Sequence, residues 1–206
     1  MRPLLPIAYL PPVSWCTVAW KSEQVAVEAA EHYQKGSFRN RCYIAGPNGI
    51  QRLSIPLVKG KNRQTPIRDV RISYDEPWQR QHWRSIRTAY GNAPFFEHYS
   101  DKLIRFYEQP YTFLYDYNQE LLHFIFEKCW GWKGSFTTTT QYHPAGQWPN
   151  GTDFRSDFSA DKQHAPGWFE PRPYAQVFME KSGFIPNLSM LDLLFCCGKQ
   201  ASDLLN

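Results

Sequence analysis

The sequence predicts an α/β fold in which a mixed β-sheet is covered by helices, with an α+β arrangement as the alternative. Short apolar or alternating segments, typical of strands, occupy much of the first 60 residues. An Asn-Gly pair at Asn48 separates two of them and predicts a β-hairpin over about residues 42–58. Segments with a helical apolar period follow from residue 78 onward. The 206 residues suffice for a well-buried core, and we expect one domain over residues 1–206.

The first half of the chain contains most of the predicted strands. Residues 4–10 are apolar and bounded by prolines, which predicts a buried strand, and residues 24–29 alternate in polarity like a second strand. Between them, residues 14–20 fit a short helix or a turn. We expect residues 60–66 to form a basic loop, and the alternation of residues 67–73 predicts another strand.

Four helices are predicted from residue 78 onward. The most regular one places Trp78, His82 and Ile86 on a single face. The last one is a strongly apolar segment that ends before Gly198, and glycine is a common helix stop. The predicted helices cover residues 78–90, 101–108, 112–129 and 187–195.

Between the third and fourth helices the chain has little periodicity. The β-branched residues 135–140 predict one more strand, and residues 175–179 fit a strand or a helix start. Residues 141–173 are rich in Gly, Pro, Asn, Asp and Ser, which predicts a long irregular loop. A loop of this length is unusual inside a compact domain and indicates function or motion, while its five Trp and Phe side chains argue against disorder.

Positive charge is concentrated in the middle third of the chain. Residues 35–105 carry fourteen Lys or Arg and five Asp or Glu, a net charge of +9, whereas residues 1–34 carry −1 and residues 106–206 carry −4. Such asymmetry indicates an anionic partner, although a solvated surface that pairs with the acidic third explains it equally well. The high aromatic content, 17%, suits a ligand pocket or an interface as well as a core.

The segment HYQKGSFRNRCY, residues 32–43, is the densest cluster of side chains that could bind an anion. The one acidic residue close to it is Glu31, directly before the segment. Lysine, a hydroxyl group and a glycine that lets the backbone approach the anion can together hold a phosphate or a carboxylate. Arginine can add bidentate hydrogen bonds. The segment does not match a Walker A loop. The alternative is a solvent-facing hairpin with ion pairs to the acidic third. Its cations or potential cations are His32, Lys35, Arg39 and Arg41.

Roles follow from the side-chain chemistry. His32 or His82 is the candidate general base, because histidine titrates near neutral pH, although a lone histidine on an apolar helix face is more often a core residue. Asn40 or Tyr33 is the candidate for polarising or orienting the substrate. Arg80, Arg84 and Arg87 would form a basic stripe that either a ligand or acidic side chains must compensate. The expected phosphate ligands are Lys35, Arg39, Arg41, Arg84 and Arg87.

Two residues near the C-terminus are expected to have structural or orienting roles. Asn187 precedes the last apolar helix and can cap it. Asp192 interrupts the apolar segment, so its carboxylate needs a partner, for which the basic middle third is the obvious source. A buried ion pair is favoured over a general base or a group that orients a histidine.

Several classes of function and site are disfavoured. The five cysteines are odd in number and lack a CxxC pair, which predicts reduced, mostly buried thiols rather than disulfides or a zinc site. No metal site is predicted, and no hydrolase, zinc-protease or kinase motif occurs. The prolines near the N-terminus do not fit a signal peptide and no segment is apolar enough to span a membrane, so a cytoplasmic protein is expected. Nucleic acid is a weak candidate partner, and a homo-oligomer stays open.

Four sequence segments together resemble the WbqC-like family. They are YLPPVSW, HYQKGSFRNRCYI with the following LSIPL, WQRQHWRSIRTAYGNAPFFEHY and GFIPNLSMLDLLF, in this order over about residues 5–200. One departure is Pro6–Tyr9, where the family often has a Gln-Pro-Asn-Tyr type of strand end. The positions that match the family pattern are Tyr9, Pro11, His32, Tyr33, Gln34, Lys35, Asn40, Arg41, Trp78, His82, Tyr90, Asn187 and Asp192.

The resemblance implies a bacterial protein linked to surface-polysaccharide (O-antigen) clusters, where an aminoacyl or glycyl transfer to a sugar has been suggested for some members. Together with the basic segment, it leads us to expect a transferase that moves an acyl, aminoacyl or glycosyl group. The donor would carry phosphate, as a nucleotide sugar, a coenzyme A thioester or an acyl carrier does, and the ligand would be a small anion. The alternatives are a non-catalytic module that binds an acidic protein or nucleic acid through residues 35–105, and a hydrolase that uses the long loop as a lid.

Overall fold

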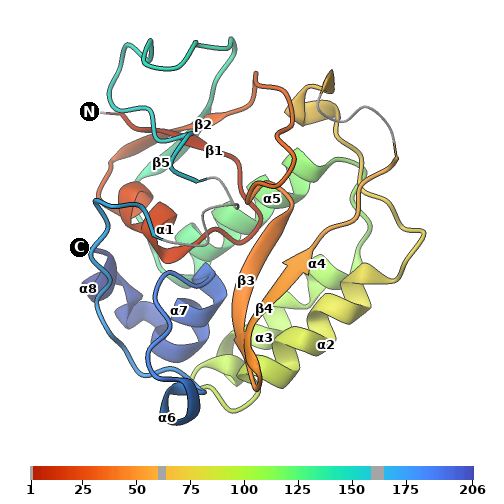
Figure 1. Cartoon of the computed structure of the whole chain (residues 1–206), viewed down its shortest axis with the longest axis vertical. Coiled ribbons are helices and arrows are strands. Elements are labelled where there is room, and N and C mark those ends of the chain that lie inside the picture. Colours follow the sequence, from red (N-terminus) through yellow and green to blue (C-terminus); the bar gives the residue numbers. More distant parts are fainter. Residues whose placement is uncertain (1, 60–63, 159–164) are drawn as a thin grey trace.

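The computed structural model describes residues 2–59, 64–158 and 165–206, so most of the predicted basic loop at 60–66 lies outside the described residues. The chain contains both a parallel sheet and an antiparallel hairpin surrounded by helices, which confirms the predicted fold class (Figure 1). The parallel sheet consists of β1 (Leu4–Pro6), β2 (Gln24–Glu28) and β5 (Ser135–Thr138), with β2 in the centre.

β1 and β2 are buried and mostly apolar, whereas β5 (Ser-Phe-Thr-Thr) is exposed or half-buried at one edge of the sheet. Leu5 pairs with Val27, and Val27 pairs with Thr138, so the three strands end at nearly the same level. β1 is shorter than the predicted strand at 4–10, since the chain leaves the sheet after Pro6. Part of the long loop covers the outer edge of β1: the Leu4 amide donates to the Thr152 carbonyl, and the Phe154 amide donates to the Leu4 carbonyl.

The predicted hairpin is present as β3 (Arg41–Gly46) and β4 (Gly49–Ser54), and it forms a two-stranded sheet of its own. Gly49 adopts a φ of +106°, which glycine reaches without the steric cost of a Cβ. The second strand ends at Ser54, earlier than the expected residue 58.

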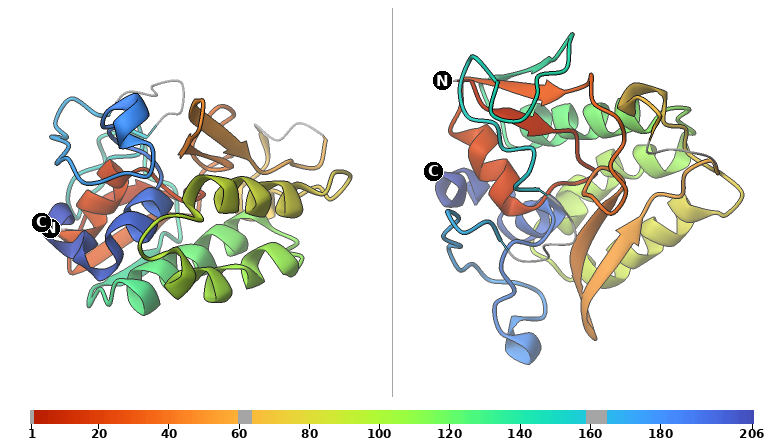
Figure 2. Two further views of the ribbon diagram at one scale, coloured as in Figure 1. Left: turned by 90° about the horizontal axis from the view of Figure 1, so that it is seen from below. Right: turned by 45° about the horizontal axis from the view of Figure 1, so that its top comes forward.

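Helices surround the two sheets. The helix α1 (Val13–Trp20) connects β1 to β2 and packs beside α7 (Met190–Cys197) and α8 (Ala201–Leu205), as Figure 1 shows. Figure 2 shows, in yellow to green, the helices that lie between the hairpin and β5 in the sequence. These are α2 (Trp78–Tyr90), α3 (Phe96–Leu103), α4 (Arg105–Glu108) and α5 (Leu114–His123), the last of which continues as a π-helix at Phe124–Cys129.

The predicted strand at 67–73 is wrong. Residues Ile67–Asp69 form a 3-10 helix after Pro66, and only single bridges follow it, from Arg71 to Phe113 and from Ile72 to Leu57. Ile67 and Val70 are both fully buried, so the apolar spacing that reaches the core here is three residues. At 175–179 the chain forms no strand, and the short helix α6 (Met179–Ser182) begins there.

The core is unusually aromatic. Its fully buried side chains include Trp15, Trp78, Phe126 and several tyrosines, and all eight residues of α7 are buried. Gly198 ends α7 with a φ of +57°, as the sequence predicts. All five cysteines are free and buried, which confirms the prediction for this residue type.

Candidate functional site

A cleft of about 570 Å³ lies where the chain leaves the central strand β2. In parallel α/β sheets, ligands bind outside the carboxyl ends of the strands, and this cleft occupies that position. Tyr142, which follows β5, lies at the cleft together with the segment that follows β2. The lining residues are Ala30, Glu31, His32, Tyr33, Gln34, Lys35 and Tyr142.

Three of the predicted site residues therefore lie together. His32 and Lys35 are exposed, and Tyr33 between them is buried. Gly36, with a φ of +81°, lets the chain turn directly after Lys35, and the Ser37 hydroxyl donates to the Gln34 carbonyl inside that turn. The turn leaves the Lys35 ammonium group in solvent beside the cleft.

A buried ion pair between Arg39 and Glu31 anchors the segment that lines the cleft. The Arg39 guanidinium donates two hydrogen bonds of 2.7 Å to the Glu31 carboxylate, and the two side chains are only 1% and 2% exposed. Burial raises the pKa of Glu31, and the charge of Arg39 opposes that rise. Because the Arg39 guanidinium is committed to Glu31, its geometry favours anchoring of the cleft over direct contact with a ligand.

A second buried ion pair joins the sheet to the long loop. Arg155 donates to the Glu28 carboxylate at 2.6 Å, to Asp153 and to the His143 carbonyl. Glu28, the last residue of β2, also accepts from the Thr139 hydroxyl and from the backbone amide that follows Ala29. The Arg155 guanidinium lies 5.0 Å from the centre of the Tyr142 ring, so this network fixes the wall of the cleft that Tyr142 provides.

Arg41 lies next to the cleft segment without lining the cleft. Burial raises the pKa of Tyr33, while the charges of Arg41 and Arg39 oppose the rise. The buried Nε of Arg41 has no hydrogen-bond partner among the described residues. An anionic oxygen would satisfy this donor.

Asn40 supports the backbone around the cleft. Its side-chain amide donates to the Ile55 carbonyl at 2.9 Å, while its Oδ1 is buried and has no partner in the described part of the chain. The amide of Asn118 donates in the same way to the Arg39 carbonyl at 2.7 Å. Asn40 does not line the cleft, so its geometry favours positioning of the segment over contact with a substrate.

His82 lies in the core, away from the cleft-lining residues. Its Nδ1 is 3.0 Å from the Tyr9 hydroxyl, which also contacts the Tyr107 hydroxyl. Burial lowers the pKa of His82 to about 4, with an opposing contribution from the Ser54 backbone. A neutral, enclosed imidazole of this kind suits a hydrogen-bonded core residue, so His32 is the histidine that the geometry favours for proton transfer.

The predicted arginines of α2 point elsewhere. Arg84 and Arg87 are exposed on this helix, and neither lines the cleft. Together with Arg80 they form the basic stripe that the sequence predicts, and none of the three has an ion-pair partner within the ranges that the structure describes.

The two C-terminal residues have structural partners that differ from the expected ones. Asn187 does not cap α7, whose N-cap is Ser189; with a φ of +56°, it accepts a hydrogen bond of 2.9 Å from the Ser14 amide at the start of α1. The predicted ion pair of Asp192 is wrong, since its described partners are Tyr174 at 2.7 Å and Gln176 at 2.9 Å. Burial raises the pKa of Asp192, partly offset by these hydrogen bonds.

Several residues of the site were missed from the sequence. Glu28 and Thr139 are polar residues at the ends of predicted strands, and this position in the sequence could have indicated that they belong to the site. Arg155 and Tyr142 lie in the long loop and gain their roles only through folding, because Arg155 reaches Glu28 across 127 positions of the chain.

The described residues include no group of three or more His, Cys, Asp or Glu placed to hold a metal ion. Within the same residues, no helix has both the length and the apolar character needed to cross a membrane.

The model of the WbqC-like protein family matches residues 7–153. The chain belongs to this family. It is also 29% identical to "Uncharacterized protein Rv1507c" of Mycobacterium tuberculosis over 194 residues, which cover 84% of this chain and 83% of that protein. No solved structure matches the chain. The matched family region contains the cleft segment, the Arg39–Glu31 ion pair and Glu28. Arg155, the partner of Glu28, lies just beyond this region.

Proposed function

We propose that this WbqC-like protein is a transferase that moves an acyl, aminoacyl or glycosyl group from a phosphate-bearing donor to an acceptor. The observation that carries the proposal is the pairing of exposed His32 and Lys35 at one cleft beyond the end of β2. Parallel sheets place ligands at this edge, and an imidazole that lines the same cleft as a cation can accept a proton next to a bound anion.

The chemistry assigns each residue one task. Lys35 binds the donor phosphate, with Arg41, whose buried Nε has no partner among the described residues, as a second cation. His32 accepts the proton of an acceptor hydroxyl or amine as the acceptor atom bonds to the transferred carbon. With a nucleotide sugar, the bond from the anomeric carbon to phosphate oxygen breaks and the nucleotide leaves with the electron pair. With a thioester, the carbon–sulfur bond breaks and the thiolate leaves.

A ligand screen by thermal unfolding tests this proposal. The panel contains nucleotide sugars, coenzyme A and acyl coenzyme A, nucleoside phosphates, sugar phosphates and a short nucleic acid. A donor at about 100 times its Kd adds about 2.7 kcal/mol, which raises Tm by roughly 5–10 °C for a chain of this size. The rise should fall to about half or less in Lys35→Ala and persist in Lys133→Ala, which removes an exposed lysine that does not line the cleft.

Ligand binding does not report turnover, so a separate assay measures product formation. The donor class that binds is incubated with candidate sugar and amine acceptors, and product is measured for the wild type and His32→Gln. Loss of turnover with retained donor binding supports the base role of His32. Turnover that is unchanged in His32→Gln contradicts that role.

A second candidate function rests on the basic stripe of α2. Arg80, Arg84 and Arg87 are exposed and lack ion-pair partners among the described residues, as expected for a module that docks on an acidic protein or a nucleic acid. A strongly salt-dependent association with the nucleic acid of the panel, lost when Arg84 and Arg87 are replaced by Gln, would favour this candidate.

A further inference from the structure

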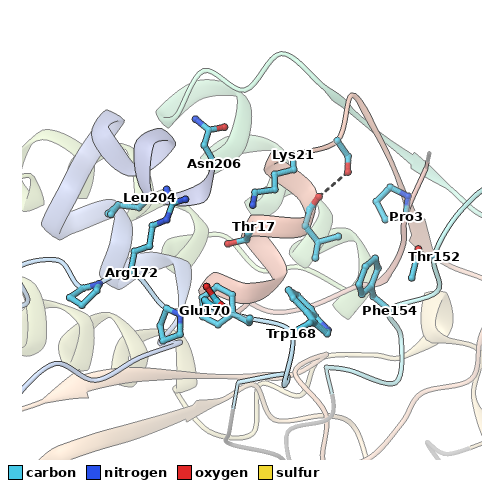
Figure 3. Close-up of a pocket in the computed structure, with 15 residues that line it drawn as sticks. Pro3, Thr17, Lys21, Thr152, Phe154, Trp168, Glu170, Arg172, Leu204 and Asn206 are labelled. Atoms are coloured by element: carbon cyan, nitrogen blue, oxygen red, sulfur yellow. Dashed lines mark hydrogen bonds between the residues drawn. The ribbon is translucent and has the colours of Figure 1, made fainter.

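A cavity of about 860 Å³ lies at the opposite edge of the parallel sheet, near the residues that lead into β1 and β2 (Figure 3). Pro3 and Ser22, which precede these strands, both line it, together with part of α1, the end of α8 and the segment 168–173. It shares no lining residue with the cleft that contains His32 and Lys35. Its volume is that of a typical small-molecule site.

One side of the cavity is an aromatic platform. Trp168 is 43% exposed, although its indole N–H donates to Asp157 at 2.7 Å and its ring packs edge-on against Phe154 at 5.5 Å. Phe169 contacts the same indole ring. The orientation of Trp168 is therefore fixed while much of its surface stays open to the cavity. An indole held in this way is suited to stack on a flat ring.

The other side is cationic. Figure 3 shows Lys21 and Arg172 on the side of the cavity away from Phe154 and Trp168. Lys21 directly follows α1, is exposed and has no ion-pair partner in the described part of the chain. Arg172 donates to the Asp203 carbonyl at 3.0 Å, which orients its guanidinium group. Among the lining side chains, Glu170 is the one acid against these two cations.

Two hydroxyl groups that line the cavity, those of Thr17 and Ser22, have a defined polarity. Thr17 donates to the Val13 carbonyl and Ser22 donates to the Val18 carbonyl, both within α1 or its last turn. Their hydrogens are used, so toward the cavity these oxygens can only accept. They fit a ligand that presents its own hydroxyl donors between a ring and an anionic group.

We propose that this cavity binds a nucleoside monophosphate, with its base stacked on Trp168 and its phosphate held by Lys21 and Arg172. The sugar hydroxyls of such a ligand face the acceptor oxygens of Thr17 and Ser22. The proposal is independent of the transferase activity, because the two sites have no residue in common.

Calorimetric titration of the whole chain with AMP tests the proposal, with adenosine and ribose 5-phosphate as truncated ligands. We expect AMP to bind and each truncated ligand to bind at least about fivefold more weakly, since each lacks one of the two contacts. Trp168→Ala should weaken AMP binding by about fivefold or more, and Tyr74→Ala, an exposed aromatic residue outside the cavity, should leave it unchanged.

A charge variant keeps the test decisive if Trp168→Ala fails to fold. Lys21→Gln alters an exposed position and should reduce AMP binding without reducing adenosine binding, whereas Lys133→Ala, which removes an exposed lysine outside both sites, should change neither. Absence of AMP binding to the wild type overturns the proposal. Equal binding of AMP and adenosine, or AMP binding that survives Lys21→Gln and the Trp168 variant, also overturns it.

Discussion

Arg39 and Glu31 form a two-pronged ion pair almost completely shielded from water, directly beneath the segment that carries His32 and Lys35. The net contribution of such a pair to the free energy of folding is small, because removing two charges from water costs about as much as their attraction returns. Its main effect is to fix the position of the backbone segments that it joins. Its position indicates that it holds the cleft segment in place.

Breaking the Arg39–Glu31 pair on one side should be costly. Arg39→Met leaves the Glu31 carboxylate buried and unpaired, and we expect the free energy of unfolding to fall by about 3–5 kcal/mol. The double variant Glu31→Leu/Arg39→Met should lose much less, since neither charge remains. Urea unfolding of the three proteins measures this, and a single variant as stable as the wild type would contradict the structural role.

His82 should make stability depend on pH in a defined direction. Its pKa is lowered to about 4 in the folded chain, compared with about 6.5 for an unperturbed histidine. Its contribution is therefore fully present above pH 6.5 and is lost as pH falls through 4, by about 3 kcal/mol in total. The stability advantage of wild type over His82→Gln should shrink over this pH window. A pH-independent difference between the two proteins would show that His82 is not held neutral.

Asp192 should act in the opposite direction. Burial raises its pKa, so its contribution is complete below the unfolded value and is lost as pH rises through the folded value. Asp192→Asn keeps an oxygen that can accept from Tyr174 and Gln176 and removes the charge. We expect the stability of this variant relative to wild type to improve as pH rises from about 4 to 7, measured by thermal unfolding. A relative stability that worsens over this range would show that the carboxylate is needed in its charged form.

Local sequence signals predicted the elements that depend on neighbours along the chain. The helix of Trp78 and the hairpin at Asn48 follow from periodicity and turn chemistry, and both are present. The 3-10 helix at Ile67 was missed because Val70 and Ile72 are two residues apart, as in a strand, which obscured the three-residue spacing from Ile67 to Val70. The predicted segment from His32 to Lys35 does line a cleft, since its residues are adjacent in sequence.

Contacts between distant segments could not be predicted in this way. Asn187 does accept a hydrogen bond from a helix N-terminus, as its side-chain chemistry suggests. The helix is α1, which begins at Val13 and is far from Asn187 in the sequence. Arg155 and Glu28 form their pair only because part of the long loop packs on the edge of β1. Whether a charged residue lies at a surface or in a core ion pair, as Arg39 does, is decided by such packing rather than by its sequence neighbours.

The measurement that tests the account most directly is a calorimetric titration with inorganic pyrophosphate, the minimal charged group of a nucleotide-sugar donor. We predict binding to the wild type and to Lys133→Ala, with a loss of about tenfold or more in Lys35→Ala, because a charge-assisted contact contributes about 1.5–3 kcal/mol. Unchanged binding in Lys35→Ala, or no binding to the wild type, would contradict the assignment of the cleft beyond β2 as the donor site.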